Sequence, residues 1–161
     1  EHGFPARLVT PGLYGYVSAT KWLTDIEVTT FADFESYWVP RGYAAEAPIK
    51  TMARIDVPAA GSVATAGETF IAGVAWAQTV GISKVEVKID GDDWEEAELA
   101  DALNNDTWRQ WRFPWAATEG NHTLRVRATD NDGNLQTEEQ VAPLPDGASG
   151  WHTVLVNVRA A

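Results

Sequence analysis

Residues 121–130 read NHTLRVRATD and show the pattern that decides the fold of most of the chain. Every second residue from Leu124 to Ala128 is apolar, and the two residues between them are Arg125 and Arg127. A period of two places the apolar side chains on one face of an extended segment and the charged ones on the other. The stretch therefore predicts a half-buried β-strand whose apolar face points into a core.

Three further runs show the same alternation. Their apolar faces consist of Phe70, Ala72, Val74 and Trp76 in residues 69–78, of Val85, Val87 and Ile89 in residues 83–90, and of His152, Val154, Val156 and Val158 in residues 151–160. Turn sequences such as DGDD, ATEGN and DNDGN separate the runs. About seven short strands are expected, and the stretch WEEAELADAL is either a helix or a strand followed by a loop.

These features predict a mainly β fold, an antiparallel sandwich of immunoglobulin type over residues 50–161. The chain has no cysteine, so the disulfide of antibody domains cannot form. Five of the eight tryptophans lie between residues 76 and 115. We expect Trp76 or Trp108 to fill the space between the two sheets.

Composition excludes several classes of protein. The formal net charge of -11 argues against nucleic-acid binding, because phosphates would be repelled and no basic stripe offsets the repulsion. No apolar run approaches the ~20 residues that cross a bilayer. Most of the acidity lies after residue 50, where it favours solubility.

Residues 1–49 do not have the pattern of a complete domain. RLVT and KWLTDIEVT are typical of strands, and FADFESYWVPRGYAAEAP indicates a loop with a helical turn. Two or three strands bury too little surface to be stable alone. This segment is therefore expected to pack on the sandwich, on another chain, or on a domain outside the sequence.

The first fifty residues contain specific motifs. HGFPARLVTPG is followed by TKWL, by SYWVPRGYA and by APIKTMARIDVP, and WRQWRFPW and GASGWHTVLVNV come later. This combination resembles the C-terminal part of the sulfite-oxidase family of molybdopterin oxidoreductases. The resemblance implies that residues 1–49 are the C-terminal remnant of a molybdenum-cofactor-binding domain and that residues 50–161 are an immunoglobulin-like dimerisation domain.

The resemblance also implies roles for individual residues. His2 and Arg7 match the His and Arg of an HGxPxR motif that contacts the pterin cofactor and its phosphate. Ala19, Thr20 and Lys21 match a segment before WL that holds the same cofactor. Tyr43 matches a tyrosine of the substrate pocket, where its phenol hydrogen-bonds an oxyanion.

In this family a cysteine thiolate binds the molybdenum, and the present chain has none. The resemblance thus implies a fragment that is not catalytically competent alone. Molybdopterin with molybdenum is expected in a full-length parent, and none is expected to be retained by the fragment. The implied partners are a second copy through the sandwich, the missing N-terminal catalytic domain and a small oxyanion substrate, and the implied location is extracytoplasmic in bacteria, with the parent membrane-tethered in some cases.

Simpler interpretations stand beside these. Arg7 and Lys21 could be ordinary surface charges, and Tyr43 could be a packing aromatic. Asp130, Asp132 and Asn134 resemble the start of a calcium loop, but Leu135 stands where the loop needs glycine, so a hairpin turn is expected.

The sequence leaves two questions open. An arginine of the sandwich could reach an anion pocket, with Arg109 and Arg112 as candidates on opposite faces of their strand. The whole chain could also be a stand-alone immunoglobulin-like interaction module. A carbohydrate-binding sandwich is disfavoured, because Trp108 and Trp111 are expected on opposite faces.

Overall fold

The structure is a computed structural model, and it describes residues 4–160 of the 161-residue chain. The chain divides into two compact units. Unit 1 consists of Glu1–Lys50 and Gln140–Ser149, and unit 2 consists of Thr51–Glu139 and Gly150–Ala161. The sequence indicates a boundary after residue 49, but it gives no indication that residues 140–149 pack with the N-terminal segment.

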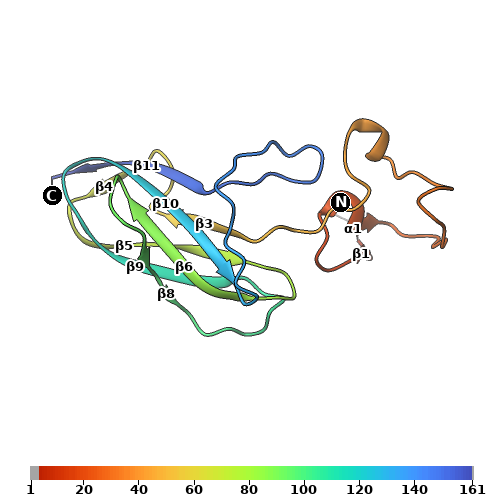
Figure 1. The fold of residues 1–161 in the computed structure, drawn as a ribbon, viewed down its shortest axis with the longest axis horizontal. Coiled ribbons are helices and arrows are strands. Elements are labelled where there is room, and N and C mark those ends of the chain that lie inside the picture. Colours follow the sequence, from red (N-terminus) through yellow and green to blue (C-terminus); the bar gives the residue numbers. More distant parts are fainter. Residues whose placement is uncertain (1–3, 161) are drawn as a thin grey trace. The chain divides into compact units, whose positions relative to one another are not determined.

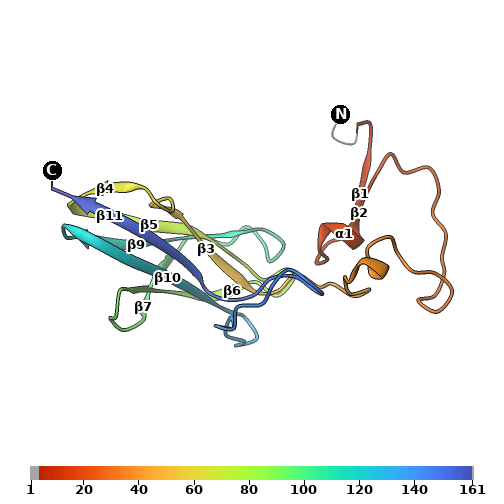
Figure 2. The same cartoon turned by 90° about the horizontal axis from the view of Figure 1, so that it is seen from above.

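Unit 2 is a sandwich of two β-sheets (Figures 1 and 2). The five-stranded sheet has the order β4 (Val63–Thr65), β11 (His152–Arg159), β10 (Gly120–Asp130), β6 (Ile82–Ile89) and β7 (Glu95–Glu96). The four-stranded sheet has the order β3 (Met52–Val57), β5 (Gly67–Trp76), β9 (Arg109–Ala117) and β8 (Glu98–Leu99). All pairs are antiparallel except β4 with β11, which confirms the mainly β, antiparallel fold class.

The core lies between the two sheets, and three of the four predicted strand faces are correct. Leu124, Val126 and Ala128 of β10 are fully buried. They pack with inward residues of β6 and β11, which are Val85, Val87, Val154, Val156 and Val158. These alternating β-branched side chains suit a pleated surface that is buried on one side only.

The expected orientation of β5 is wrong. Ile71 and Ala75 are fully buried, whereas Phe70 is 48% exposed and shares the outward face with Ala72 and Val74. The cause is the neighbouring strand β9, whose Trp111 lies opposite Gly73. A Cβ at residue 73 would come within 3.0 Å of the Trp111 ring, so only small inward residues fit beside it.

The tryptophans of the interior are also not the expected ones. Trp111 and Trp115 are buried between the sheets, at 3% and 5% exposure. Trp76 and Trp108 instead pack against each other, with ring centroids 5.8 Å apart, and Trp108 is 46% exposed. The inward side of β9 is set by its alternation from Trp111 to Ala117, and Trp108 precedes that strand.

The stretch WEEAELADAL forms two short strands, β7 and β8, followed by a loop. The helical alternative is therefore wrong for these residues. Pro114 lies in β9 beyond the last residue that β8 pairs with, Arg112. A proline has no backbone N–H to donate. Because β8 does not pair with residue 114, no hydrogen bond to β8 is lost there.

Unit 1 has little regular structure. It contains β1 (Arg7–Val9), the short helix α1 (Gly15–Ser18), β2 (Ala19–Lys21) and the 3-10 helix η1 (Val39–Arg41). The helical turn expected after residue 30 is confirmed by η1. The strand expected over KWLTDIEVT is wrong, because β2 ends at Lys21, the first residue of that stretch, and residues 22–29 form no strand. Among the described residues of this unit only Ser18 and Ala47 are buried.

Across residues 4–160, no helix combines the length and the apolar character needed to span a membrane.

Candidate functional site

The β1–β2 ladder brings together four of the predicted site residues. Its register pairs Arg7 with Lys21, Leu8 with Thr20, and Val9 with Ala19. Residues directly opposite in an antiparallel pair have Cβ atoms only about 5 Å apart. Two residues 14 positions apart in the sequence thus place their cationic side chains side by side on one short ladder.

Arg7 and Lys21 lack a carboxylate partner in the part of the chain that the structure describes, and both residues are exposed. The Lys21 ammonium lies 5.9 Å from the Trp22 ring centroid. The Trp22 indole N–H in turn donates to the Phe4 carbonyl at 2.9 Å, which anchors the end of β2 beside the start of β1. Like charges directly opposite on a ladder repel each other, and an anion between them would remove that cost.

The connection between the two strands is held by backbone hydrogen bonds. Thr10 N–H donates to the Ser18 carbonyl at 2.8 Å, which closes the loop that contains α1. Gly12 has a φ of 80°, in the left-handed region that glycine adopts without strain. Its carbonyl accepts from Ile49 N–H at 2.8 Å, and Tyr14 N–H donates to the Ala47 carbonyl at 2.9 Å, so the loop is fixed to residues 47–49.

A depression of about 840 Å³ lies beside this ladder in unit 1. Ala19 and Thr20 contribute to its lining, together with Phe31, Phe34 and Ala47. Most of the lining is apolar, and Phe31 and Phe34 are 71% and 64% exposed. The hydroxyl of Ser36, also in the lining, is buried and has no hydrogen-bond partner among the residues that the structure describes.

Tyr43 lies within a small aromatic cluster of unit 1. Its ring centroid is 4.7 Å from that of Tyr16 and 5.5 Å from that of Trp38, and its side chain is half-buried. Tyr43 does not line the depression, whereas Tyr16 does. The geometry therefore describes Tyr43 as a packing residue in this chain, and its role in a substrate pocket stays a prediction.

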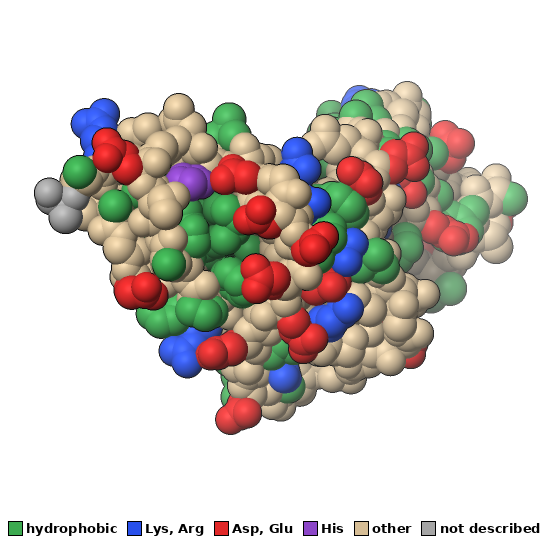
Figure 3. Space-filling view, turned by 60° about the vertical axis from the view of Figure 1, so that its left-hand side comes forward, with side chains coloured by type: hydrophobic (Ala, Val, Ile, Leu, Met, Phe, Trp, Pro, Cys, Tyr) green, Lys and Arg blue, Asp and Glu red, His purple; other side chains and the backbone are tan. Residues whose placement is uncertain are grey.

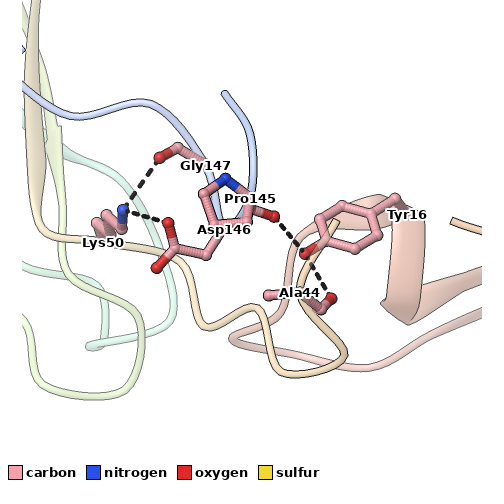
Figure 4. A network of polar contacts seen from close by, with 6 residues as sticks. All are labelled: Tyr16, Ala44, Lys50, Pro145, Asp146 and Gly147. Carbon is pink, nitrogen blue, oxygen red and sulfur yellow. Dashed lines mark hydrogen bonds and ion pairs between the residues drawn. The ribbon is translucent and has the colours of Figure 1, made fainter. Parts of the chain in front are cut away.

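Tyr16 belongs to a polar network that the sequence did not predict (Figure 4). Its hydroxyl donates to the Ala44 carbonyl at 3.0 Å and lies 3.4 Å from the Pro145 carbonyl. Partial burial and the nearby Asp146 carboxylate raise the pKa of Tyr16.

The same network ties residues 140–149 into unit 1. The Lys50 ammonium contacts the Asp146 carboxylate and the Gly147 carbonyl, each at 3.0 Å. Ala44 N–H donates to the Pro145 carbonyl at 2.8 Å. Two of these three acceptors are the backbone carbonyls of Pro145 and Gly147, which lie far along the chain from Ala44 and Lys50. A backbone carbonyl is present in every residue, so no sequence motif predicts these contacts.

The remaining predicted residue of this site, His2, lies outside the described residues. Its role is untested by the structure. Arg7, Ala19, Thr20 and Lys21 therefore form the described part of the candidate site.

Several arginines of the sandwich have local carboxylate partners. Arg112 faces outward and contacts Glu98 at 2.7 Å, and Arg127 contacts Glu86 at 2.9 Å while lying 4.2 Å from the Trp94 ring centroid. Arg109 is half-buried, and its Nε has no hydrogen-bond partner within residues 4–160. Acidic groups predominate on the face drawn in Figure 3, where basic groups lie beside several of them.

The DNDGN segment is a turn, as expected. Asp130 is 5% exposed, and its carboxylate accepts hydrogen bonds from the backbone N–H groups of Asp132 and Asn134 at 3.0 and 2.9 Å. Burial raises the pKa of Asp130, but these hydrogen bonds outweigh it and hold the pKa below its ordinary value. Within residues 4–160 no cluster of three metal-ligating side chains is found.

Comparison with known proteins assigns the two parts of the chain separately. Residues 1–38 match the family described as oxidoreductase molybdopterin binding domain, and residues 52–126 match the family described as bacterial Ig domain. Mitochondrial sulfite oxidase of Rattus norvegicus is 28% identical over 187 residues, and that of Homo sapiens is 27% identical. Both alignments cover 98% of this chain.

Sequence similarity relates this chain to the sulfite oxidase family. The match to a bacterial Ig domain confirms the immunoglobulin-like sandwich. The chain spans about a third of the length of the sulfite oxidases that it matches, since the alignments cover 34% of each. The crystal structure of the sulfane dehydrogenase SoxCD from Paracoccus pantotrophus has a similar fold, with a TM-score of 0.67 over 100% of this chain and 48% of that chain at 21% identity.

Proposed function

We propose that this chain is the C-terminal part of a molybdenum-cofactor-dependent oxidoreductase of the sulfite oxidase family. In that protein unit 1 contributes contacts to the cofactor phosphate, and the sandwich forms a homodimer. The parent is proposed to act on a small oxyanion and to lie outside the cytoplasm. The observation that carries the proposal is the pairing of Arg7 with Lys21 inside the segment that matches a molybdopterin-binding domain.

The chemistry of this pair suits a phosphate group. Arginine offers several N–H donors in a planar fork, and lysine adds a compact positive charge. Both are exposed and without a carboxylate partner in residues 4–160, so no described residue neutralises either of them. Thr20 can add a hydroxyl donor, and its backbone belongs to the same short strand.

The residues of this chain fit the phosphate end of the cofactor but supply no thiolate ligand for its metal. A thiolate ligand requires cysteine, and the chain has none. When bound, the molybdenum cofactor supplies the redox chemistry, and the residues present here would bind and orient its phosphate end. We therefore propose that the chain is not catalytically competent by itself.

The test begins with the gene. Our proposal expects a coding sequence that continues upstream of Glu1 into a domain with a cysteine. The protein made from that complete gene is expected to contain molybdenum and pterin in equal amounts per protomer. Replacing both Arg7 and Lys21 by alanine is expected to lower that content at least about tenfold, because two charge-assisted contacts are lost.

Arg159→Ala provides a matched control, because it removes an exposed cation from unit 2. This control variant is expected to retain the cofactor. Full cofactor content in the Arg7/Lys21 double variant would contradict the assigned contacts. A gene that begins near Glu1 would contradict the whole proposal.

The second candidate is a stand-alone immunoglobulin-like interaction module. The observation in its favour is that the sandwich has a continuous core, to which nineteen of the described residues contribute, all from unit 2. A gene that begins near Glu1, together with a folded and soluble sandwich, would favour this candidate.

A further inference from the structure

A polar depression of about 300 Å³ lies at one end of the sandwich, where β5 ends, β6 and β9 begin and β10 ends. Its polar lining residues are Ser83, Asn104, Asn105, Thr107, Arg109 and Asn131. Among the described residues, the lining thus contains one cationic side chain and no acidic one. All of its residues belong to unit 2.

Arg109 occupies an inward position of β9. Buried residues alternate along this strand from Trp111 to Ala117, and Arg109 lies on the same side, two residues before Trp111. A charged side chain at an inward position costs free energy unless a partner compensates for the lost water. Within residues 4–160 no carboxylate forms an ion pair with Arg109, and its buried Nε has no hydrogen-bond acceptor.

This arrangement differs from that of three other arginines of the sandwich. Arg54, Arg112 and Arg127 each contact a carboxylate of unit 2, at 2.6, 2.7 and 2.9 Å. Arg109 instead shares its surroundings with uncharged amides and hydroxyls. The described part of the chain therefore supplies no counter-charge for this one inward cation.

Two asparagine amides add hydrogen-bond donors beside Arg109. The Asn131 Nδ2 donates to the Val80 carbonyl at 2.7 Å, and the Asn105 Nδ2 donates to the Thr79 carbonyl at 3.3 Å. A carboxamide nitrogen carries two hydrogens, so each of these groups keeps one N–H for a ligand. The depression thus combines a cation with neutral donors, which is the chemistry of an anion site.

Gly81 holds these two amides close to each other. Its φ is 88°, and a Cβ at this position would come within 2.6 Å of both the Asn105 Oδ1 and the Asn131 Nδ2. Both side chains therefore pack directly on the Gly81 backbone, where their hydrogen bonds to carbonyls fix them. Donors that are already in place lose little conformational entropy when a ligand binds.

The acidic residues next to this depression in the sequence have donors of their own. Asp106 is not part of the lining, and its carboxylate accepts a hydrogen bond from the Gln78 amide at 3.1 Å. Asp130 also lies outside the lining, and its carboxylate accepts from the backbone N–H groups of Asp132 and Asn134. Neither carboxylate pairs with Arg109, although unit 2 is acidic as a whole.

We propose that the polar depression binds a small inorganic oxyanion of the size of sulfate or phosphate, with the Arg109 guanidinium as its main contact and the Asn105 and Asn131 amides as further donors. These donors come from β9, from the loop before it and from the turn after β10, so they approach from different directions. A tetrahedral oxyanion presents oxygens in several directions, whereas a carboxylate presents two in one plane. The planar fork of arginine can donate two parallel hydrogen bonds to such oxygens. This site goes beyond the proposed function, which assigns none of these residues to the cofactor.

The test is a titration of the isotope-labelled 161-residue chain with sodium sulfate at constant ionic strength, followed by amide NMR spectra. We expect the side-chain amide signals of Asn105 and Asn131 and the backbone signal of Gly81 to shift with one common dissociation constant in the millimolar range. Arg109→Gln is expected to raise this constant at least about tenfold, because the charged fork is lost. Arg112→Gln is the matched control, since Arg112 lies on the same strand, faces outward and is not part of the lining, and it is expected to leave the constant unchanged.

The choice of anion tests the ligand class. Phosphate is expected to bind about as tightly as sulfate, and acetate at least about tenfold more weakly, because it has one charge and two oxygens. Acetate binding as tight as that of sulfate would overturn the tetrahedral class, and sulfate binding unchanged in Arg109→Gln would overturn the assigned contact.

The wild-type titration needs no variant and separates this proposal from the proposed function. An absence of sulfate-induced shifts at residues 81, 105 and 131 would overturn the site. Shifts confined to Arg7 and Lys21 would also overturn it, but they would leave the phosphate contacts proposed for unit 1 standing.

Discussion

Unit 1 and unit 2 differ most in what they bury. The described part of unit 2 encloses nineteen buried apolar residues between two sheets, whereas the described part of unit 1 buries only Ser18 and Ala47. Unit 1 also exposes large apolar side chains, among them Ile26, Val28, Phe31 and Phe34. Folding must offset a large loss of conformational entropy by burial, and only the sandwich has the burial to do so alone.

The comparison bears on function because the two units present different kinds of surface. Unit 1 presents the Arg7–Lys21 ladder and an apolar depression, which suit a cofactor and further chain packed around it. Unit 2 instead presents outer faces on which charged residues pair locally, as Arg127 does with Glu86 and Arg112 with Glu98. We infer that unit 2 is the stable scaffold and that unit 1 gains its final stability in a larger protein.

The largest expected effect comes from a cavity in the sandwich. Leu124 is fully buried, and Leu124→Ala is expected to lower the free energy of unfolding of unit 2 by about 2–5 kcal/mol. Leu23→Ala removes the same atoms from an exposed position of unit 1 and is expected to change this free energy by no more than about 0.5 kcal/mol. Urea unfolding followed by tryptophan fluorescence measures the free energy of unfolding of both variants. An equal loss of this free energy in the two variants would contradict the difference in burial between the units.

The next effect concerns two glycines, one in each unit. A Cβ added at Gly73 would overlap the Arg54 carbonyl oxygen and crowd the Trp111 ring, so Gly73→Ala is expected to destabilise the sandwich by about 1–3 kcal/mol. A Cβ added at Gly15 meets nothing within 4 Å, and the residue lies in α1. Gly15→Ala is therefore expected to be neutral in the same unfolding experiment, and a loss as large as that of Gly73→Ala would contradict the described packing.

The strands show how far the sequence alone could lead. The inward faces of β6, β10 and β11 were predictable, because each alternates apolar with polar residues and one face is unambiguous. Both faces of β5 are apolar, so its orientation depends on Trp111 of the neighbouring strand β9, forty residues later in the sequence. The face of a strand is not a local property when both of its sides are apolar.

The candidate site was predictable to a smaller extent. The resemblance to a known family named Arg7 and Lys21, but their direct pairing is a property of the β1–β2 register. The network of Tyr16, Lys50 and Asp146 was missed, because backbone carbonyls supply several of its acceptors and leave no trace in the sequence. Long-range contacts of this kind require the fold.

The smallest expected effect is the pH dependence of the stability of unit 2, to which two histidines contribute in opposite directions. Burial lowers the pKa of His122, but its hydrogen bonds to the Asp90 carboxylate and the Thr118 carbonyl, both at 2.8 Å, outweigh it and raise the pKa above 6.5. The charged ring therefore stabilises the fold fully below pH 6.5, and this contribution is lost as the pH rises through the folded-state pKa. His122→Asn is expected to cost about 1 kcal/mol at pH 5.5 and less at pH 9.

His152 has the opposite dependence. Burial and then the nearby Arg54 lower its pKa, and its Nδ1 accepts a hydrogen bond from Ile55 N–H at 3.0 Å, which requires the neutral ring. Its contribution is complete above pH 6.5 and is lost as the pH falls toward the folded-state pKa. His152→Asn is thus expected to cost more at pH 8 than at pH 5, in urea unfolding at both values. The same sign of pH dependence in the two variants would contradict these assignments.

The most direct test of the difference between the units is amide hydrogen exchange of the wild-type 161-residue chain, resolved by residue. Our account predicts slow exchange along β10 and β11 and fast exchange over residues 23–38, because the sandwich is stable alone and unit 1 is not. Protection of residues 23–38 as strong as that of β10 would contradict it and would show that unit 1 is an independently stable domain.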